Sequence, residues 1–396
     1  MNVRPVAMHN VRHCPELDRL AGWCVHEIQA SASAVVACAF RREHGWQVDE
    51  GFARIDDPNQ PEAGTDTLFD LASLTKSFVA LAFARLVRDG LVDWLMPLGV
   101  PLRDAHGTQV ASVPLLWLVA HRAGLEGHRP LYAPLQEGKI VDRCLALRQA
   151  AMALRPECLA ITPKEDGFPP CYSDLGYLLF GEAMSRASGL PLDEIIRAQI
   201  SQPLGIQARS ARQWREGEPA FVQRTAPTEV VAWRGGLVRG AVHDENAWAL
   251  GGDGLCGHAG LFATARDVAM LGAAILDALQ GTRDDWLTVE QLEPLVRRRP
   301  ESTLRAGFDG KNDHGSSSAG ERCSPDTFGH LGFTGTSFWI DPHAQVVAVL
   351  LTNRVYPKRD NLTIQMARPT IHDELFAWGL RHAHRDGRKD ADARRM

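Results

Sequence analysis

The chain has 396 residues, of which 45% are hydrophobic and 23% are charged, and this composition excludes disordered, collagen-like and coiled-coil proteins. Its length allows two or three folding units, with a core that needs no metal or disulfide support. The net charge of −5 lacks the basic excess of a phosphate-binding surface, so we expect no nucleic-acid partner.

The sequence shows no secretion signal, membrane-spanning segment, metal-binding motif or dinucleotide-binding motif. The first residues contain no apolar segment typical of secretion, and the longest apolar runs, such as residues 346–351, have the length of a strand. We therefore expect a cytoplasmic protein with no membrane contact. No C-x-x-C or H-E-x-x-H motif occurs, so we expect no metal site. Residues 252–257 match G-x-G-x-x-G but lack the flanking strand and helix, so we expect a loop and no cofactor.

The N-terminal part predicts a helix, a hairpin and a second helix. Apolar residues recur at helical spacing over residues 14–30. Extended stretches at residues 32–40 and 46–55 flank a charged segment with a glycine, which predicts a β-hairpin. Residues 68–89 are almost continuously apolar and end at Gly90, which predicts a mostly buried helix.

The remaining chain is helical first and extended later. Helical patterns dominate residues 91–299, separated by glycine and proline clusters, and no strand series appears there. Extended chain resumes at residues 335–340 and 345–352, and a helix is expected over residues 364–382. The tail at residues 384–396 has mixed charge and no apolar pattern, and we expect it to be disordered.

This order of elements predicts the fold class. Strands at both ends and helices between them favour an α+β fold, with an antiparallel sheet built from both chain ends and flanked by helices. The strand-helix alternation of a doubly wound parallel sheet is absent. We expect residues 1–90 and 302–396 to form the sheet-containing domain, and residues 91–301 to form an inserted, mainly helical domain.

The first candidate for chemistry is Ser73-Leu74-Thr75-Lys76, an S-x-x-K sequence that places a hydroxyl and an amine on one helix face. A serine needs a base to become a good nucleophile, and burial can lower the pKa of a lysine until it serves as that base. Among six lysines, Lys76 alone lies within a long apolar segment. The alternative is a serine at a helix start followed by a surface lysine.

Two later segments can join this pair. Tyr172-Ser173-Asp174 lies where a loop enters an apolar helix, so the phenol can point into a cleft. The alternative is a plain helix cap formed by Ser173 or Asp174. Gly329 to Ser337 precedes a strand, and its glycines allow a backbone N–H to approach an oxyanion. The alternative there is a glycine-rich loop with a hydrogen-bonded His330.

Taken together, the three segments resemble a known set. Ser73-Leu74-Thr75-Lys76, Tyr172-Ser173-Asp174 and His330-Leu331-Gly332 follow the order of the S-x-x-K, Y-x-N and K-T-G or H-x-G motifs of serine β-lactamases and penicillin-binding proteins. Supporting segments resemble the class C β-lactamase and esterase branch. The resemblance implies an antiparallel sheet from both termini, an inserted helical domain and an active site in the cleft between them.

The resemblance also implies roles for individual residues. Ser73 would be the nucleophile, Lys76 would accept its proton, and Tyr172 would be a second base that passes a proton to the leaving group. The N–H groups of Ser73 and Phe333 would form the oxyanion hole beside Gly332.

Two positions depart from the family pattern. Asp174 replaces the usual Asn and adds a negative charge near Lys76, which favours the protonated amine unless Tyr172 takes over as base. His330 stands in place of the third-motif lysine, where it would bind a substrate carboxylate or polar group less firmly. In this position H-x-G resembles the third motif of class C-like esterases and D-aminopeptidases. We therefore expect the protein to hydrolyse β-lactams less efficiently than a β-lactamase does.

The sequence therefore predicts a serine hydrolase that cleaves an ester or amide bond of a small molecule or peptide through an acyl-enzyme on Ser73. A D-aminopeptidase or carboxypeptidase-like peptidase is one alternative. A non-catalytic ligand-binding or sensor relative is another, and the change at Asp174 motivates it. The sequence assigns no oligomeric state.

Overall fold

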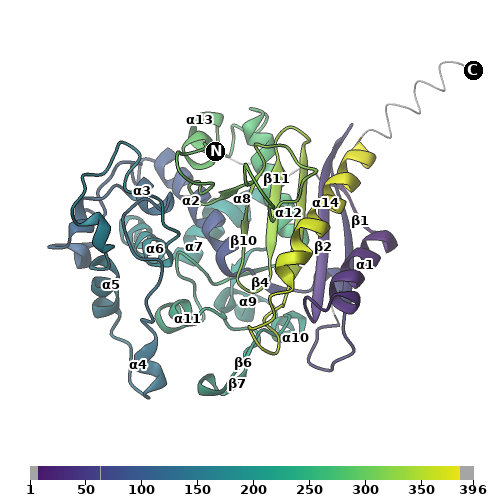
Figure 1. Ribbon diagram of the computed structural model, residues 1–396, viewed down its shortest axis with the longest axis horizontal. Coiled ribbons are helices and arrows are strands. Elements are labelled where there is room, and N and C mark those ends of the chain that lie inside the picture. The colour runs from purple at the N-terminus through teal and green to yellow at the C-terminus, as the bar shows by residue number, and fades with distance from the viewer. Residues whose placement is uncertain (1–7, 63, 384–396) are drawn as a thin grey trace, which may run out of the picture.

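The computed structural model describes residues 8–62 and 64–383, so the tail predicted to be disordered lies outside the described residues. Its main feature is a seven-stranded sheet (Figure 1). In spatial order the strands are β1 (Met8–His13), β3 (Gly45–Arg54), β2 (Ser33–Arg42), β12 (Val346–Thr352), β11 (Ser337–Asp341), β10 (Phe328–Leu331) and β9 (Asp309–Gly310).

The centre of the sheet joins the two ends of the chain. β2 and β3 form the predicted hairpin, and β12 pairs antiparallel with β2, from Val346 opposite Phe40 to Thr352 opposite Ala34. Long runs of β-branched and small apolar residues suit strands that are covered on both faces. The prediction of an α+β fold with a sheet from both chain ends is confirmed. At one edge, β1 runs parallel to β3.

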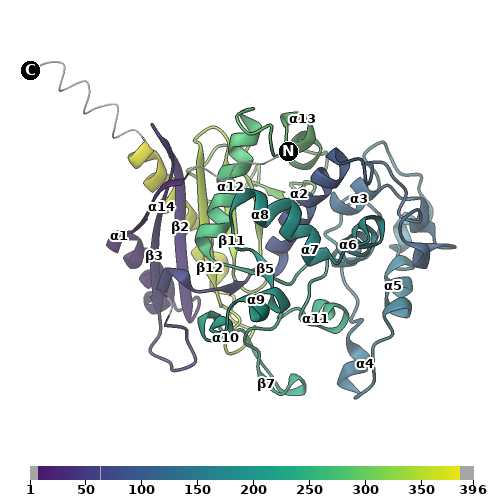
Figure 2. The same ribbon diagram turned by 180° about the vertical axis from the view of Figure 1, so that it is seen from behind.

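Helices cover both faces of the sheet, as the two opposite views show (Figures 1 and 2). Because side chains alternate along a strand, Val36 and Cys38 of β2 face α1 (Pro15–Gly22) and α14 (Ile364–Ala383). Val35 and Ala37 face the opposite layer, which includes α12 (Ala265–Leu279). The other helices are α2 (Thr75–Arg88), α3 (Leu115–Val119), α4 (Ala133–Gln136), α5 (Arg143–Ala151), α6 (Asp174–Ser188), α7 (Leu192–Ile196), α8 (Gln202–Leu204), α9 (Ala211–Gly217), α10 (Phe221–Arg224), α11 (Glu245–Gly251) and α13 (Val289–Val296).

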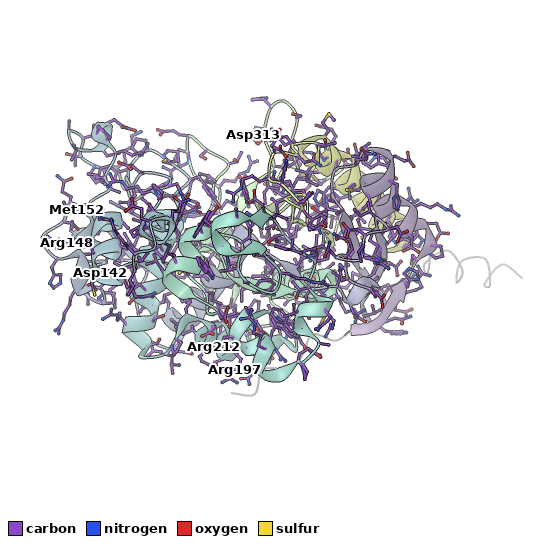
Figure 3. The ribbon with its side chains drawn as sticks, turned by 90° about the horizontal axis from the view of Figure 1, so that it is seen from below. Asp142, Arg148, Met152, Arg197, Arg212 and Asp313 are labelled. Atoms are coloured by element: carbon purple, nitrogen blue, oxygen red, sulfur yellow. The ribbon has the colours of Figure 1, made fainter. Side chains whose placement is uncertain are left out.

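The middle of the chain forms a mainly helical side next to the sheet. Asp142 begins α5 as an N-cap, where its side chain accepts a hydrogen bond from the N–H of Leu145. Figure 3 shows Asp142, Arg148 and Met152 together at the outer edge of this side, far from α14. The division into two domains stays a prediction, and α12 from the middle of the chain packs directly on β12 and β2.

Several short strands were not predicted between residues 91 and 299. A three-stranded sheet joins β4 (Phe69–Asp70), β8 (Leu261–Ala263) and β5 (Arg209–Ser210), and a two-stranded sheet joins β6 (Val230–Val231) and β7 (Gly236–Leu237). Runs of two or three residues carry too little pattern for sequence analysis to detect. Among the described residues, no helix is both long and apolar enough to cross a membrane.

Near the candidate catalytic segments, the structure differs from the prediction at two elements. The helix expected over residues 68–89 opens instead as strand β4 and a short 3-10 turn (Ala72–Leu74), and only then continues as α2. The glycine-rich stretch, for which a loop was the alternative interpretation, begins with β10, which pairs with β11 and was not predicted as a separate strand. A Cβ at Gly329 would lie 1.9 Å from the carbonyl oxygen of Phe338, so glycine is needed for this close pairing.

Candidate active site

The Ser73 segment is held in an unusual turn. The carboxylate of Asp70 accepts hydrogen bonds from the N–H of Ala72 at 2.8 Å and from the N–H of His243 at 2.7 Å. Ala72 has φ of 46°, a left-handed conformation that costs free energy for a residue with a side chain. The buried aspartate holds this turn, and Ser73 lies at the point where the turn enters α2.

Lys76 lies one helical turn after Ser73, as the S-x-x-K spacing predicted. Its Nζ donates to Ser73 Oγ at 2.9 Å, to Asp174 Oδ1 at 2.7 Å and to the carbonyl oxygen of His258 at 3.3 Å. The Lys76 side chain is fully buried, whereas Asp174 is 22% exposed. The structure therefore brings a hydroxyl, an amine and a carboxylate from two separate segments into direct contact.

The protonation state of Lys76 follows from two opposing effects. Burial lowers the pKa of the ammonium, but Asp174 and Tyr172 raise it, and the net pKa lies above the ordinary value for lysine. This direction favours the protonated amine that a negative charge at Asp174 was expected to stabilise, rather than a neutral amine produced by burial. The role of Lys76 as the base stays a prediction.

Tyr172 completes this cluster from the loop before α6. Lys76 Nζ lies 4.8 Å from the centre of the Tyr172 ring, and the other side of the cluster is formed by His121, whose ring stacks on Tyr172 at 4.6 Å. Burial and Asp174 raise the pKa of the phenol, whereas Lys76 and a hydrogen bond to Ser73 lower it, and the net pKa is raised. Tyr172 is thus a neutral phenol at neutral pH, beside the protonated amine of Lys76.

His330 does not supply the cation expected from the third motif. It lies on β10 with 4% of its surface exposed, and its Nδ1 donates to the carbonyl oxygen of Leu331 at 2.8 Å. Burial and the charge of Lys76 lower the pKa of His330 to about 3, so the imidazole is neutral. Because Nδ1 carries the proton, Nε2 can only accept a hydrogen bond, and a carboxylate finds no donor there.

The loop after β10 presents a free backbone donor. The N–H of Gly332 donates to Thr336 O at 2.7 Å, whereas the N–H of Phe333 meets no acceptor in the described part of the chain. Arg368 holds the peptide group of this N–H, because its Nη2 donates to Gly332 O at 2.8 Å. Arg354 holds the next peptide group, because its Nε donates to Phe333 O at 2.8 Å and its guanidinium lies 4.6 Å from the centre of the Phe333 ring. Thr334 ties the same loop to the carbonyl oxygen of Asp70.

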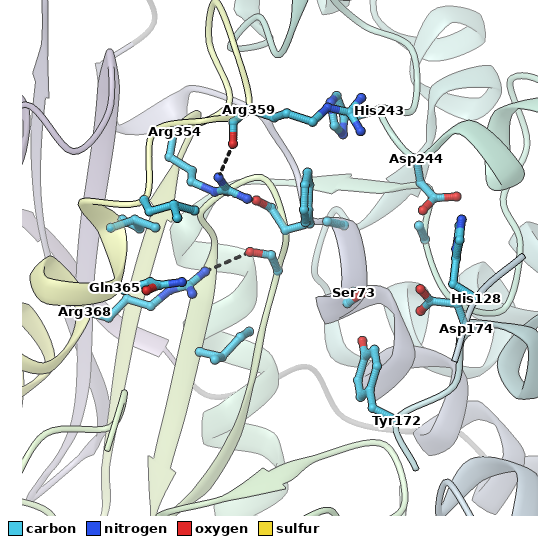
Figure 4. Close-up of a pocket in the computed structure, with 17 residues that line it drawn as sticks. Ser73, His128, Tyr172, Asp174, His243, Asp244, Arg354, Arg359, Gln365 and Arg368 are labelled. Atoms are coloured by element: carbon cyan, nitrogen blue, oxygen red, sulfur yellow. Dashed lines mark hydrogen bonds between the residues drawn. The ribbon is translucent and has the colours of Figure 1, made fainter. Parts of the chain in front are cut away.

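These segments surround one cavity of about 570 Å³ (Figure 4). It is lined by five of the residues that the sequence singled out, Ser73, Tyr172, Asp174, Gly332 and Phe333. Lys76 lies behind Ser73, and His330 is buried behind the loop that begins at Leu331. The geometry can support attack by a hydroxyl on a carbonyl group whose oxygen faces a backbone N–H.

Other residues of the cavity wall were missed by sequence analysis. Asp244 accepts a hydrogen bond from His258 Nε2 at 2.9 Å, and His258 in turn accepts from Lys76 through its carbonyl oxygen. The other polar ones are His128, His243, Arg354, Arg359, Gln365 and Arg368. Single polar residues in loops or on a helix face have the sequence pattern of solvent-exposed residues, so only the spatial arrangement reveals them. No cluster of three or more metal-ligating side chains occurs in residues 8–62 or 64–383.

Comparisons with known proteins agree with this geometry. A family model described as Beta-lactamase matches residues 25–368. A protein of Salmonella paratyphi A named "Putative D-alanyl-D-alanine carboxypeptidase" is 28% identical, and the match covers 92% of this chain and 87% of that protein.

Solved structures show the same fold at lower identity. A D-amino acid amidase from Ochrobactrum anthropi is 19% identical with a TM-score of 0.59, and the match covers 92% of this chain and 99% of the amidase. EstCE1, described as a hydrolase with promiscuous acyltransferase activity, is 19% identical with a TM-score of 0.64, with coverage of 89% and 97%.

Proposed function

The chain belongs to the β-lactamase family and is a serine hydrolase, and from this premise we propose that Ser73 is its nucleophile and that hydrolysis proceeds through an acyl-enzyme. The observation that carries the proposal is the contact of 2.9 Å between Ser73 Oγ and Lys76 Nζ at the cavity wall. A serine hydroxyl beside a buried cation and a phenol is the arrangement that acyl transfer needs.

We propose that Tyr172 is the group that accepts the proton of the Ser73 hydroxyl. Lys76 already carries a proton, so it cannot accept another, but its charge lowers the cost of forming a phenolate next to it. In this scheme the ionised form of Tyr172, a phenolate, accepts the proton as Ser73 Oγ bonds to the carbonyl carbon, and Tyr172 becomes a neutral phenol. The phenol then returns the proton to the leaving group when the ester or amide bond breaks.

The oxyanion of the tetrahedral intermediate would be bound by two backbone donors, the N–H groups of Ser73 and Phe333. The N–H of Phe333 supports this assignment because it has no acceptor within the described residues, and Arg368 holds its peptide group by donating to Gly332 O. A donor that is already in place stabilises the developing charge without reorganisation. Water would then attack the acyl-enzyme and release the acid.

The substrate we propose is a small ester, amide or peptide. The cavity of about 570 Å³ has the size of a small-molecule site. A D-aminopeptidase or carboxypeptidase-like peptidase remains a second candidate, since the Salmonella relative is named as a putative carboxypeptidase. A panel of matched ester and amide substrates separates the two candidates.

Covalent labelling tests the nucleophile. A fluorophosphonate probe should label the wild type, and mass spectrometry of peptides should locate the adduct on Ser73. The Ser73→Ala protein should give no adduct and should lose p-nitrophenyl ester hydrolysis. Ser77→Ala is a matched control, because it removes a hydroxyl one turn away that donates to Gly307 O, outside the proposed chemistry. Equal labelling of wild type and Ser73→Ala rejects the proposal.

A further inference from the structure

A second, smaller cavity lies between the C-terminal end of α13 and the edge strand β9. Its volume is about 50 Å³, and it shares no lining residue with the cavity at Ser73. One buried water molecule needs about 10 to 15 Å³, so this cavity has space for a ligand of several non-hydrogen atoms. Four basic side chains line it, together with the single acidic residue Asp313, which Figure 3 shows at the outer edge of the molecule. The basic residues are Arg298, Arg299, Arg305 and Lys311.

Arg299 and Arg305 are buried cations without a counterion. They are 5% and 4% exposed, and no carboxylate lies within ion-pair distance of either one among the described residues. Each donates at 2.6 Å to a carbonyl oxygen at the end of α13, Arg299 to Pro294 and Arg305 to Val296. A helix end carries only about half a negative charge, so most of the two positive charges is left uncompensated.

Both arginines stay charged, and Lys311 adds a third positive charge. Burial and a neighbouring arginine lower the pKa of Arg299 and of Arg305 to about 10, which leaves both protonated at neutral pH. The Nζ of Lys311 donates to the carbonyl oxygens of Glu321 at 3.1 Å and Cys323 at 2.9 Å. Three cations around the cavity are thus held in place by backbone carbonyls.

The carboxylates that act on Arg305 from a greater distance each have another partner. Asp313 pairs with Arg298 at 2.8 Å, where both side chains are about half exposed, and Asp326 pairs with His343 at 2.8 Å. Asp309 accepts a hydrogen bond from the next N–H in the chain, and burial raises its pKa, which favours its neutral form. These groups moderate the positive charge of the cavity without filling it.

The Nε and Nη2 edge of Arg305 faces Gly310, which also lines the cavity. A Cβ at Gly310 would lie 3.4 Å from Nε and 3.5 Å from Nη2 of Arg305. Nη2 donates to Asp326 O at 3.2 Å, whereas the buried Nε has no hydrogen-bond partner. Two adjacent donors on one edge of a guanidinium are the group that binds two oxygens of an oxyanion, and the missing side chain at Gly310 leaves this edge uncovered.

We propose that this cavity is a binding site for a small tetrahedral oxyanion, free phosphate or sulfate. The anion would supply the negative charge that Arg299 and Arg305 lack and an acceptor for the Nε of Arg305. The size of the cavity fits the free anion rather than a larger phosphate ester. Because the site lies outside the cavity at Ser73, the proposal stands or falls independently of the hydrolase chemistry.

Isothermal titration calorimetry of the full chain tests the site with inorganic phosphate, at an ionic strength held constant with sodium chloride. The wild type should bind one phosphate per chain, and sulfate should compete with it. Phosphate should also raise the midpoint of thermal unfolding, because it binds the folded chain. No saturable binding above the chloride background overturns the proposal. Glycerol 3-phosphate should bind more weakly than free phosphate, and stronger binding overturns the assignment to a free anion.

Variants locate the site. Arg305→Gln should weaken phosphate binding at least about tenfold, as expected for the loss of a charged hydrogen bond. Lys311→Gln, on the partly exposed wall, should weaken it as well. Lys139→Gln is the matched control, since it makes the same change in net charge at a side chain that is 70% exposed, and it should bind like the wild type. Arg354→Gln should also bind like the wild type, which excludes the arginines of the cavity at Ser73.

The outcome does not depend on one variant. If Arg305→Gln does not fold, Arg305→Lys, which keeps the charge but loses the two-donor edge, and Lys311→Gln decide. Phosphate binding that persists unchanged in the folded Arg305 and Lys311 variants overturns the proposal. Loss of binding in Arg354→Gln alone places the anion beside Ser73 and overturns it as well.

Discussion

Asp174 controls the electrostatics of the residues around Ser73. Its Oδ1 lies 2.7 Å from Lys76 Nζ, and its charge raises the pKa of both Lys76 and Tyr172. A carboxylate at this position keeps the amine protonated and makes the phenol harder to ionise. The proposed proton acceptor, Tyr172, is therefore fully active only at alkaline pH.

We predict that Asp174→Asn shifts the pH profile of ester hydrolysis. In the wild type, kcat/KM should rise with pH as the phenol ionises. Removal of the negative charge lowers the pKa of Tyr172, so the rise should occur at lower pH, by about one unit, with up to about tenfold faster turnover near neutral pH. Stopped-flow or steady-state assays from pH 6 to 10 measure the shift.

The control for this prediction is Asp313→Asn, a change in an exposed loop that should leave the profile unchanged. A rise at higher pH in the Asp174 variant would contradict the assignment, because removal of a neighbouring negative charge lowers the pKa of a phenol. An unchanged profile would show that neither Lys76 nor Tyr172 limits the rate.

At the scale of elements, α12 packs closely on the sheet. Gly272 faces β12, and a Cβ at this position would lie 2.5 Å from Cγ1 of Val347. A branched side chain on a central strand cannot move away without disturbing its own neighbours. This close approach sets the distance between the α12 layer and the sheet.

We predict that Gly272→Ala lowers the free energy of unfolding by about 1 to 3 kcal/mol, because the added methyl group overpacks the interface. Gly22→Ala in α1 is the matched control, since its nearest atom is Cδ2 of His26 at 3.8 Å. That control should raise stability by about 0.5 to 1 kcal/mol through helix propensity. Urea denaturation measures both, and equal effects would contradict the packing argument.

Some of the helices and strands could be predicted from the sequence, and others could not. The hairpin of β2 and β3 follows from two β-branched runs around a glycine turn, and the burial of Lys76 follows from its apolar neighbours. Strand β10 was missed because its glycine weakens strand propensity, and only the close approach to Phe338 explains it. The turn at Ala72 was missed because its conformation depends on the distant loop at His243.

The candidate site was predicted where chemistry and spacing coincide, and missed where it depends on tertiary structure. The contact between Ser73 and Lys76 follows from helical spacing. The neutral state of His330 depends on burial under neighbouring elements, which the pattern does not show. Arg354 and Arg368 resemble solvated residues in the sequence, and only the fold shows them buried beside the cavity.

At the scale of the whole molecule, one hydrophobic core spans both parts of the chain. It joins Val35 and Val347 of the sheet to Leu118 and Leu179 of the helical side through buried residues of α2 and α12. A shared core couples the free energies of the parts that contribute to it. The proposed inserted domain is therefore tied to the sheet by packing as well as by the chain.

We predict that the chain unfolds in a single cooperative step. Native-state hydrogen exchange at increasing denaturant should bring amides of β12 and of α6 to the same free energy of opening, because both belong to this core. Residues of α4, which are partly exposed, serve as a control and should open at lower free energy. Earlier opening of α6 than of β12 would indicate an independent helical unit.

The pairing of β2 with β12 also bears on how the protein forms in the cell. Phe40 lies opposite Val346, the first residue of β12, so the first hairpin leaves the ribosome long before its central neighbour is translated. During that interval the hairpin exposes an apolar edge that invites aggregation. Nascent chains of this hydrolase should consequently depend on chaperones until the last strand has been synthesised.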